Sequence, residues 1–327
     1  MPHVKKVVTI GGGTGTFTVL SGLKKYPLDL TAVINMVDDG GSTGRLRDEF
    51  GVLPPGDLRQ GLVALSEASP MMRKLFTHRY TKGDLEGHSF GNIFISTLEQ
   101  VSGSLDKALD VAGNILNIRG RVIPVTLTKV RLVAELNNGK MIHGEGVLDN
   151  YQLLSRFGIK RIYLKPKAKP NPKALQAIKE ADVIIIGPGD LYTTMIPNLL
   201  VVGKAIAKSK AKKIYVASLM NKHGHTDDFT VFDYIKTLER VMGTENVFDV
   251  VIYNTKTPNK ALVKKYSDEG EPVSLGAVPK KLPFKLVGAP ILGAGVAKKS
   301  KSDKALHSLI RHDPDKLANA IVKALTR

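Results

Sequence analysis

The segment that most constrains the fold is the N-terminal one, where an apolar run leads directly into a cluster of glycines. Val7-Val8-Thr9-Ile10 is followed by Gly11-Gly12-Gly13-Thr14-Gly15-Thr16, and a stretch with helical spacing begins there. A strand, a glycine turn and a helix in this order leave bare backbone N–H groups at a helix N-terminus, where an anion binds. The sequence therefore predicts a phosphate-binding turn; a tight structural turn is the alternative.

Apolar β-rich runs alternate with helical patterns over most of the chain, which is typical of a parallel sheet with crossover helices. The predicted strands are Val4–Ile10, Asp29–Met36, Arg121–Thr126, Arg161–Leu164, Val183–Ile186, Ile214–Leu219 and Val247–Tyr253. The predicted helices are one from the glycine turn to about Tyr26, then 57–67, 70–80, 88–101, 104–118, Pro172–Glu180, Pro197–Lys208 and Asp227–Met242.

The segment Val130–Val147 has a different pattern, because Asn137-Asn138-Gly139 tolerates the positive φ of a tight hairpin turn. We therefore predict one α/β nucleotide-binding domain over residues 1–327, with a mostly parallel sheet and flanking helices. Its two insertions are a helical block at about 57–118 and a small antiparallel hairpin at about 130–147.

Composition excludes several classes of protein. The chain has no cysteine, which excludes a disulfide scaffold, thiolate metal centres and a cysteine nucleophile. Its longest apolar runs, such as Val183–Ile186 and Leu199–Val202, fall far below the roughly 20 residues that cross a bilayer. The N-terminus lacks an apolar leader, so we expect an unprocessed cytoplasmic protein with no membrane span.

The net charge of +18 is unevenly distributed. Residues 1–150 carry 17 basic and 15 acidic side chains, whereas residues 151–327 carry 31 and 15. A basic half attracts polyanions, so a nucleic-acid-binding protein is one alternative. Aromatic residues make up only 6% of the chain and are not interleaved with the lysine clusters, which favours solvated surface lysines instead.

The second predicted strand leads into Asp38-Asp39-Gly40-Gly41-Ser42, followed by Arg45 and Arg47. Carboxylates at this position accept hydrogen bonds from a ribose or hold Mg²⁺ through oxygen, so Asp38 and Asp39 are candidate metal ligands and catalytic residues. Guanidinium groups bind phosphate through paired hydrogen bonds. An internal network of aspartate–arginine pairs is the alternative.

Two further turns open helices. Asp57 follows Pro54-Pro55-Gly56 and is predicted to cap a helix N-terminus, while Arg59 in the first turn can point into the site. In Gly87-His88-Ser89-Phe90-Gly91-Asn92, the side chains of His88 and Asn92 share one helix face and can orient a substrate or supply a general base. An N-cap at Ser89 with a solvated histidine is the alternative.

A third glycine turn, Gly187-Pro188-Gly189-Asp190-Leu191-Tyr192-Thr193-Thr194, follows the most apolar strand. Because ligands of open α/β sheets bind outside the carboxyl ends of the strands, we expect these turns to converge at one edge.

Asn221 and His223-Gly224-His225 follow a later strand, close to Asp227 and Asp228. A metal site is conceivable there, but no strict ligand spacing is present. We predict a polar loop, with Thr226 or Asp227 capping the next helix.

Two known phosphate-binding patterns were compared with the glycine-rich segments, and neither fits fully. The dinucleotide fingerprint requires a glycine where Thr16 stands, which weakens the case for NAD. Gly40–Arg45 lacks the lysine and the spacing of a P-loop, so a P-loop ATPase is disfavoured.

In order and spacing, these motifs resemble the CofD-like family, and within it the gluconeogenesis factor (YvcK-like) branch. The matching segments cover about two thirds of the chain and are Gly11–Gly15, Asp38–Arg47, Pro54–Arg59, Gly87–Asn92, Gly187–Thr194 with Ile196–Val201, and Asn221. The resemblance implies a Rossmann-like α/β fold and suggests a homodimer. After Asn221 the chain departs from its branch, where Lys222-His223-Gly224-His225-Thr226 replaces the usual Met-Thr-Gln-containing stretch.

The two branches of this family imply different functions. The enzyme branch transfers a phospholactyl-type group from a guanylyl diphosphate donor to a deazaflavin alcohol with Mg²⁺. The gluconeogenesis-factor branch is linked to carbon metabolism and cell shape and binds UDP-sugars, and the loop after the second strand resembles this second form. We therefore expect a regulatory protein that binds a nucleotide sugar, with a Mg²⁺-dependent phospholactyl-type transferase as the alternative.

The expected ligand-binding residues come from these turns and from the resemblance. We expect the diphosphate on Gly12–Gly15 and Gly189, the nucleoside near Asp38 and Asp39 with Arg45 nearby, and the sugar toward His88 and Asn92. The full set is Gly11, Gly12, Gly13, Thr14, Gly15, Asp38, Asp39, Gly40, Gly41, Ser42, Arg45, His88, Ser89, Asn92, Gly187, Gly189, Asp190, Tyr192, Thr193, Asn198 and Asn221. Asp38, Asp39 and His88 are the candidate catalytic residues.

Overall fold

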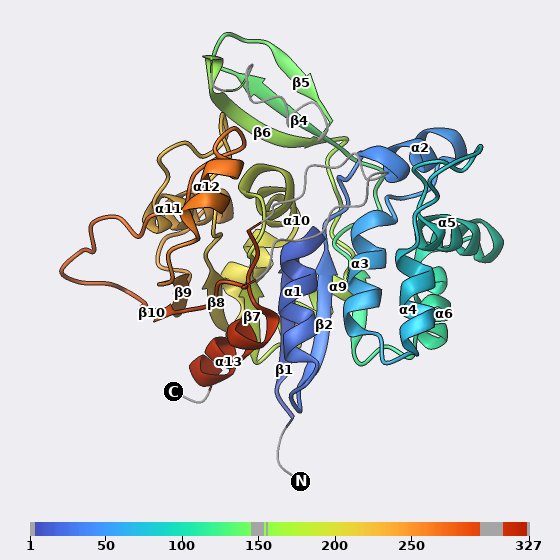
Figure 1. Cartoon of the computed structure of the whole chain (residues 1–327), viewed down its shortest axis with the longest axis horizontal. Coiled ribbons are helices and arrows are strands. Elements are labelled where there is room, and N and C mark those ends of the chain that lie inside the picture. The colour runs from blue at the N-terminus through green and yellow to red at the C-terminus, as the bar shows by residue number, and fades with distance from the viewer. Residues whose placement is uncertain (1–3, 145–153, 155, 295–309, 326–327) are drawn as a thin grey trace.

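In the computed structural model, which describes residues 4–144, 154, 156–294 and 310–325, seven parallel strands form a sheet with helices on both faces (Figure 1). In their order across the sheet, the strands are β10 (Lys285–Ala289), β9 (Val250–Asn254), β8 (Lys212–Val216), β7 (Val183–Ile186), β1 (Lys6–Gly11), β2 (Asp29–Ile34) and β3 (Arg121–Pro124). This is the predicted mostly parallel α/β architecture.

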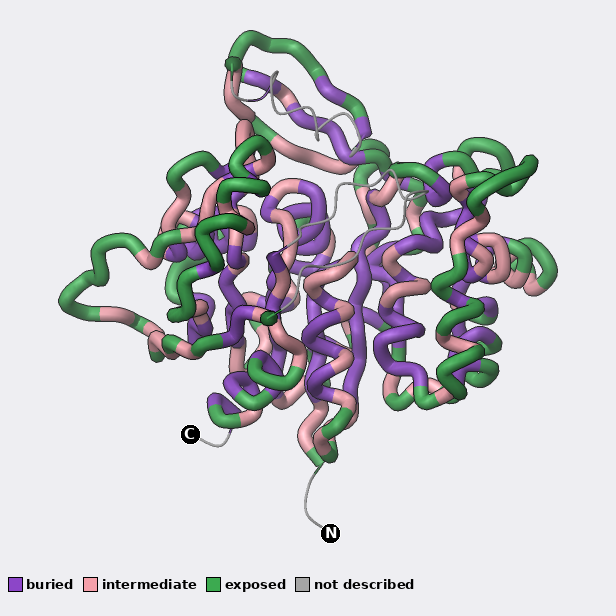
Figure 2. Tube along the Cα trace, in the orientation of Figure 1, coloured by how far each residue is buried: buried purple, intermediate pink, exposed green. Residues whose placement is uncertain are grey.

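The central strands are buried because both of their faces are covered. All four residues of β7 and five of the six residues of β1 are buried, and Figure 2 shows this pair in the colour of buried residues. Continuous β-branched runs such as Val183–Ile186 suit a parallel sheet with helices on each side. β1 pairs with β2 and β7, with Val7 opposite Leu30 and Val183, so the glycine turn follows a strand that is fixed on both edges.

Two layers of helices cover this sheet. On one face α1 (Gly13–Leu23) packs between α3 (Gly56–Leu65) and α13 (Pro314–Leu325). On the other face α10 (Ile196–Lys208) packs between α9 (Pro172–Glu180) and α11 (Val231–Met242). In the described ranges, no helix has the length and apolar character needed to cross a membrane.

The predicted helical block is present at one end of the sheet. It contains α3, α4 (Pro70–Thr77), α5 (Phe90–Ser102) and α6 (Leu105–Ile115). The sequence did not predict α2 (Gly41–Phe50), because its two glycines and short polar side chains are typical of a turn. It also missed α12 (Lys260–Tyr266), β10 and α13.

A separate antiparallel sheet lies above the carboxyl ends of the main strands in Figure 1. It consists of β4 (Arg131–Leu136) between β5 (Met141–His143) and β6 (Ile159–Lys165). The predicted hairpin is therefore present as far as Gly144, and its last residues, 145–147, lie outside the described residues.

The prediction that Arg161–Leu164 rejoins the main sheet is wrong, because this segment is the third strand of the small sheet. Every residue of β6 is exposed or half-buried, which suits an antiparallel sheet with one solvated face rather than a parallel core.

The start of α11 also differs from the prediction. The helix begins at Val231, and its cap is Thr230, whose hydroxyl accepts from the Asp233 N–H while the Asp233 carboxylate accepts from the Thr230 N–H. This capping box replaces the predicted cap at Thr226 or Asp227.

We predict that Gly22→Ala destabilises the chain by loosening the contact between α1 and α13. A Cβ on Gly22 would lie 2.1 Å from the Pro314 carbonyl oxygen and 2.8 Å from the Ala318 Cβ. Overpacking of this kind costs about 1–3 kcal/mol, which exceeds the roughly 0.5–1 kcal/mol that alanine contributes to helix propensity. Urea denaturation measures the change, with Ser21→Ala in the same helix as control. A Gly22→Ala protein at least as stable as the original would contradict this packing.

Candidate functional site

The candidate site lies where the strand order changes direction. The chain passes from β1 to β2 and β3 on one side, and later places β7 on the other side of β1. In parallel α/β sheets, the crevice outside the carboxyl ends of two such strands is the usual ligand site. The loops that follow β1 and β7 are Gly11–Gly15 and Gly187–Thr194, two of the predicted glycine turns.

These two loops touch each other. A Cβ on Gly15 would lie 2.0 Å from the carbonyl oxygen of Pro188, so only glycine permits this approach. The buried Asn198 amide donates to the carbonyl oxygens of Gly11 at 3.1 Å and Thr194 at 2.9 Å. Asn198 was predicted as a ligand contact, and in the structure its hydrogen bonds hold the two loops together.

The first glycine turn forms the start of α1. Gly11 ends β1, Gly12 is the N-cap in extended backbone, and Gly13, Thr14 and Gly15 form the first helical turn. Within the crevice, the N–H of Gly13 donates a hydrogen bond to the carboxylate of Asp57. A Cβ on Gly12 would lie 2.3 Å from Asp57 Oδ2. A carboxylate of the chain itself therefore occupies part of the predicted phosphate cradle.

Asp57 does not cap α3 as predicted. The N-cap of α3 is Pro55, and Asp57 lies inside the first turn. From that position its side chain reaches across to α1 instead of to its own helix.

Asp38 is the second carboxylate in this crevice. Its Oδ1 accepts from the N–H of Gly40 at 3.0 Å, and the hydroxyl of Thr43 donates to the same carboxylate. A Cβ on Gly56, the first residue of α3, would lie 2.4 Å from Asp38 Oδ2. Asp38 therefore joins the start of α2 to the start of α3.

Burial makes both carboxyl groups hard to ionise. It raises the pKa of Asp57 to about 7, with a further contribution from the negative charge of Asp38. Burial also raises the pKa of Asp38, against the hydrogen bonds from Gly40 and Thr43. A site with two such carboxyls gains stability from a proton or from a cation.

The charge of Asp39 acts on Asp38 as the sequence suggested, and Asp57 is a further buried carboxyl beside Asp38. The side chain of Asp39 lies against Gly144 and is 3.9 Å from an Arg131 guanidinium nitrogen, on the side of the small sheet. Arg47 also serves this junction, since it donates to the carbonyl oxygens of Asp38 and Val130 at 2.8 Å each.

Gly40, Gly41 and Arg45 lie at the exposed start of α2. The Arg45 guanidinium donates to the Glu86 carbonyl oxygen at 2.7 Å, which leaves the residue at the rim of the crevice.

A buried polar network joins α2 to the start of α5. Ser42 Oγ accepts from the Ser89 N–H and from the Asn92 amide, both at 3.3 Å, and lies 3.1 Å from His88 Nδ1. With two donors already on this oxygen, the hydroxyl proton points to Nδ1, and the Arg59 Nε donates to Asn92 Oδ1 at 2.8 Å. Burial and the charge of Arg45 lower the pKa of His88, which keeps the ring neutral.

The alternative of a solvated His88 is thus wrong, since the residue is 6% exposed. Ser89 does occupy the N-cap position of α5, but its buried hydroxyl has no hydrogen-bond partner among the residues that the structure describes.

Asp190 organises the loop after β7. Its Oδ1 accepts from the N–H groups of Tyr192 at 3.0 Å and Thr193 at 2.9 Å, capping the π-helical turn η1 (Leu191–Met195). Burial alone would raise the pKa of Asp190, but Lys222 and His225, at 3.8 and 3.9 Å, together with the Thr193 hydrogen bonds, hold it below its ordinary value. This carboxylate is therefore ionised.

The side chain of Asn221 is hydrogen-bonded to other residues of the chain and has a structural role. The Tyr234 hydroxyl donates to its Oδ1 at 2.9 Å, and its amide donates to the Phe229 carbonyl oxygen at 2.9 Å. These bonds hold the loop of residues 221–230, which brings Lys222 and His225 to Asp190.

The N-termini of four helices are consequently joined by a chain of side-chain contacts. Asp57 links α1 to α3, Asp38 links α3 to α2, and Ser42 links α2 to α5. Each helix N-terminus carries about half a positive charge and unpaired N–H groups, so each of them attracts anions.

Sequence reasoning missed several residues of this site. Asp57 was assigned a capping role, and Lys222 and His225 stand in the loop where the motif departs from its family. Asn35, directly after β2, also bonds across the crevice, since its amide donates to the Thr193 carbonyl oxygen at 3.0 Å. A polar residue in a buried apolar run was the available signal for Asn35.

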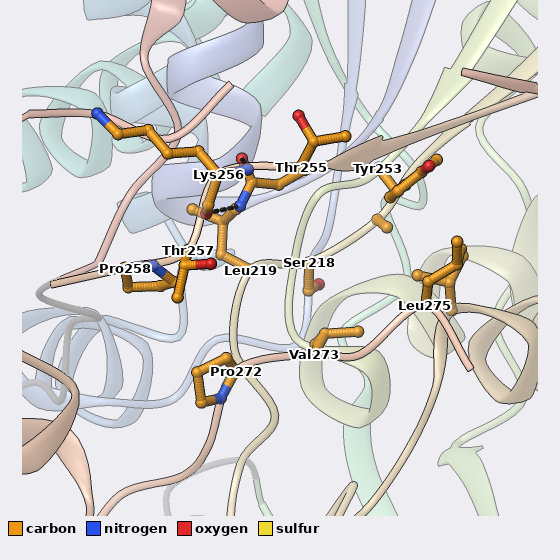
Figure 3. A pocket seen from close by; sticks show the side chains of 13 residues that line it. Ser218, Leu219, Tyr253, Thr255, Lys256, Thr257, Pro258, Pro272, Val273 and Leu275 are labelled. Carbon is orange, nitrogen blue, oxygen red and sulfur yellow. Dashed lines mark hydrogen bonds between the residues drawn. The ribbon is translucent and has the colours of Figure 1, made fainter. Parts of the chain in front are cut away.

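A cavity of about 170 Å³, here called the β8–β9 cavity, lies beside the crevice at the carboxyl ends of β8 and β9. Figure 3 shows Ser218, Tyr253, Thr255 and Lys256 on one part of its lining, with Pro272 and Val273 on another. The Ser218 hydroxyl donates to the Gly189 carbonyl oxygen at 3.0 Å, so the cavity wall is tied to the loop after β7.

Comparisons with known proteins give one consistent family. The family model described as 2-phospho-L-lactate transferase CofD matches residues 7–288. The chain is 37% identical to the gluconeogenesis factor of Bacillus subtilis over 329 residues, or 99% of each chain. It is 42% identical to the gluconeogenesis factor of Listeria monocytogenes over 262 residues, which are 79% of this chain and 80% of the relative.

A solved structure agrees with these matches. The crystal structure of a Bacillus halodurans protein of the UPF0052 family matches this chain with a TM-score of 0.85 and 34% sequence identity. The match covers 98% of this chain and 100% of that one.

We predict that the free energy of unfolding falls as the pH rises from about 5 to 8, and that Asp57→Asn reduces this fall. The folded-state pKa of Asp57, about 7, lies above its ordinary value of 3.8, so the folded chain binds more protons between these values. Stability is then lost as pH rises, by an amount on the order of a few kcal/mol. Urea denaturation at several pH values measures the slope, with the exposed Asp84→Asn as control. Equal slopes for Asp57→Asn and the unchanged chain would contradict a buried protonated Asp57.

Proposed function

The chain belongs to the CofD-like family, and we propose that it is a cytoplasmic nucleotide-sugar-binding protein in the gluconeogenesis-factor branch of that family. The single observation that carries the proposal is the chain of contacts that joins the starts of α1, α3, α2 and α5 beside the crevice. We propose a UDP-sugar as the ligand and a regulatory role in carbon metabolism and cell shape. The name gluconeogenesis factor, which the relatives share, supports the link to carbon metabolism.

The diphosphate would lie on the first glycine turn. Backbone N–H groups at the start of α1 bind phosphate oxygens beside the Asp57 carboxyl, and Gly15 and Gly189 keep the two loops close. The dipole of α1 adds to this, contributing typically 0.3–1 kcal/mol to a nearby anion. The charge of Arg45 stands at the rim of the same crevice.

The other parts of the ligand are assigned by position. The nucleoside would lie near Asp38 and Asp39, where the loop after β2 meets the small sheet. The sugar would lie toward His88 and Asn92, whose buried hydrogen bonds fix that wall of the site. A neutral His88 suits hydroxyl recognition, because its Nδ1 accepts from Ser42 and its Nε2 therefore carries a hydrogen that can be donated to a hydroxyl oxygen.

Asp57 must respond when a diphosphate binds. Its carboxylate shares the Gly13 N–H with the proposed phosphate position, and two anions repel each other there. Protonation of Asp57 relieves this repulsion, and so does a divalent cation. Asp38 and Asp57 fit Mg²⁺, since hard carboxylate oxygens are its ligands and buried acidic pairs gain most from a cation. We propose this pair, in place of Asp38 and Asp39, as the Mg²⁺ ligands.

A transferase is the second candidate function, favoured by the printed description of the family model and by the Asp38–Asp57 pair. In such a transfer the hydroxyl oxygen of an acceptor attacks the phosphorus of a nucleoside-diphosphate-linked donor. The acceptor proton passes to a carboxylate such as Asp57, whose pKa of about 7 suits a general base, and a nucleoside monophosphate leaves. Release of GMP or UMP in the presence of donor, acceptor and Mg²⁺ distinguishes this function from binding alone.

We predict that the chain binds UDP-N-acetylglucosamine with Mg²⁺ present, and that Gly15→Ala weakens binding at least about tenfold. The added Cβ pushes the loop after β1 away from Pro188, and a misplacement of this size costs more than about 1.4 kcal/mol. Calorimetric titration measures the affinity. Gly203→Ala in α10 is the matched control, because its Cβ meets mainly the flexible Met242 side chain at 3.1 Å.

The absence of heat at millimolar ligand, with the fold intact by circular dichroism, would refute the proposal. Equal weakening by Gly15→Ala and Gly203→Ala would show that the loop contact is not responsible.

We further predict that without Mg²⁺ the affinity for this ligand falls as the pH rises from 6 to 8. Ionisation of Asp57 near pH 7 places a negative charge beside the diphosphate, whereas the protonated group does not. Asp57→Asn should flatten the pH profile, and Mg²⁺ should restore affinity at pH 8 in the unchanged chain only. Calorimetry at three pH values, with Asp84→Asn as control, tests this. A pH profile that Asp57→Asn leaves unaltered would contradict the proposed role of this carboxyl.

A further inference from the structure

A cluster of metal-ligating side chains lies outside the set of residues described for the crevice. It contains His223 and Asp227 from that loop and Glu271 from the segment after α12, here called the 223–227–271 cluster. His223 Nδ1 lies 2.8 Å from Asp227 Oδ1 and 3.4 Å from Glu271 Oε2. The three ligand atoms all lie within 4.8 Å of one another.

The backbone holds the two segments of the cluster together. The Asn221 N–H donates to the Glu271 carbonyl oxygen at 2.7 Å, and the His223 N–H donates to the Glu269 carbonyl oxygen at 3.0 Å. A further bridge joins Met220 to Pro272. The ligand side chains therefore project from a paired backbone and not from two independent loops.

Each carboxylate of the cluster is oriented by one of its own oxygens. Asp227 Oδ2 accepts from the Gly224 N–H at 2.7 Å, and Glu271 Oε1 accepts from the Asp228 N–H at 3.0 Å. These bonds turn the other oxygen of each carboxylate toward His223 Nδ1. The arrangement is thus preorganised before anything binds, which lowers the cost of ordering the ligands.

The tautomer of His223 is fixed from outside the cluster. Its Nε2 lies 2.9 Å from the carbonyl oxygen of Ser267, and a carbonyl only accepts, so Nε2 carries a hydrogen. Metal-binding histidines typically donate their second ring N–H to a backbone carbonyl in this way. Nδ1, facing two carboxylate oxygens, then holds either a second proton or a metal ion.

We propose that His223 Nδ1, Asp227 Oδ1 and Glu271 Oε2 form a binding site for a divalent transition-metal ion of the zinc class, with water in a fourth position. Zinc–ligand bonds of about 2.0–2.2 Å in a tetrahedron separate ligand atoms by roughly 3.3–3.6 Å. In the structure, His223 Nδ1 is 2.8 Å from Asp227 Oδ1 and 3.4 Å from Glu271 Oε2, and small rotations of these side chains bring the distances to this value. The imidazole favours Zn²⁺ over Mg²⁺, which prefers oxygen ligands only.

The exposure of the cluster suits an ion that enters from solvent. The side chains of His223, Asp227 and Glu271 are 33%, 47% and 34% exposed. A bound ion can therefore exchange, and the open position faces solvent. Three ligands with an open position are also the pattern of accessible zinc sites rather than closed structural ones.

The ion would join two segments that border the candidate site. The 221–230 loop carries Lys222 and His225, which reach Asp190, and Glu271 directly precedes Pro272 and Val273 in the lining of the β8–β9 cavity. Metal binding would thus stiffen the wall between the cavity and the loop after β7. The proposal does not depend on the identity of the ligand in the crevice.

The test is titration of the full-length, tag-free, chelator-treated chain with Zn²⁺ in the presence of millimolar Mg²⁺, which occupies carboxylate-only sites. One Zn²⁺ per chain is expected by calorimetry, with a rise in melting temperature. Replacement of Zn²⁺ by Co²⁺ should give visible absorption bands of a four-coordinate ion. His223→Ala, Asp227→Asn and Glu271→Gln should each weaken binding about tenfold or more.

Asp228→Asn is the matched control, because it removes a neighbouring charge without removing a ligand. Asp228 has a φ of 59°, a conformation that asparagine also adopts, so this variant keeps the backbone. Glu271→Gln retains the shape of the side chain, so its loss of binding is not explained by misfolding. Weak binding without fixed stoichiometry, or equal affinity in Glu271→Gln and Asp228→Asn, would overturn the proposal. Nucleotide-sugar binding is measured separately, so failure of one proposal leaves the other intact.

Discussion

The carboxyl groups of Asp38 and Asp57 are the feature on which the candidate site depends. Asp57 spans from the first turn of α3 to the Gly13 N–H, and Asp38 joins the starts of α2 and α3. The helix N-termini joined in this way carry partial positive charges. The carboxyl oxygens of Asp38 and Asp57 accept hydrogen bonds from groups at these helix starts, and burial raises the pKa of both carboxyls. The crevice therefore stays assembled without a ligand and remains sensitive to anions and cations.

This arrangement also bears on the choice between binding and catalysis. A carboxyl with a pKa of about 7 can transfer a proton near neutral pH, but a proton-accepting group alone does not make an enzyme. The side chains of Ser42, His88 and Asn92 are hydrogen-bonded to one another in a buried network, and these bonds make this wall of the site rigid. Membership of the family is compatible with both activities, because a fold supports several functions and the site decides between them.

The loop of residues 221–230 is the part of the site where this chain differs from its branch. Lys222 and His225 of this loop reach Asp190. His223 and Asp227 of the same loop belong to the 223–227–271 cluster. The hydrogen bond from the Tyr234 hydroxyl to Asn221 Oδ1 fixes the start of this loop. From the sequence, His223 and His225 with Asp227 and Asp228 were a conceivable metal site, and a polar loop was preferred. The structure turns His225 toward Asp190 and places Glu271, a residue 48 positions beyond His223 in the chain, beside His223.

The sequence by itself determined the parallel α/β core, the helical block, the hairpin and the family, because periodicity and glycine motifs are local signals. It also predicted that the loops after β1 and β7 share an edge, since parallel strands end on the same side. Only the tertiary structure decided that Arg161–Leu164 joins the small sheet, and that Asp57 reaches α1 instead of capping α3. It alone joined Glu271 to His223. Such contacts link residues far apart in the chain, and their partners are set by how whole elements pack, which no local pattern of residues encodes.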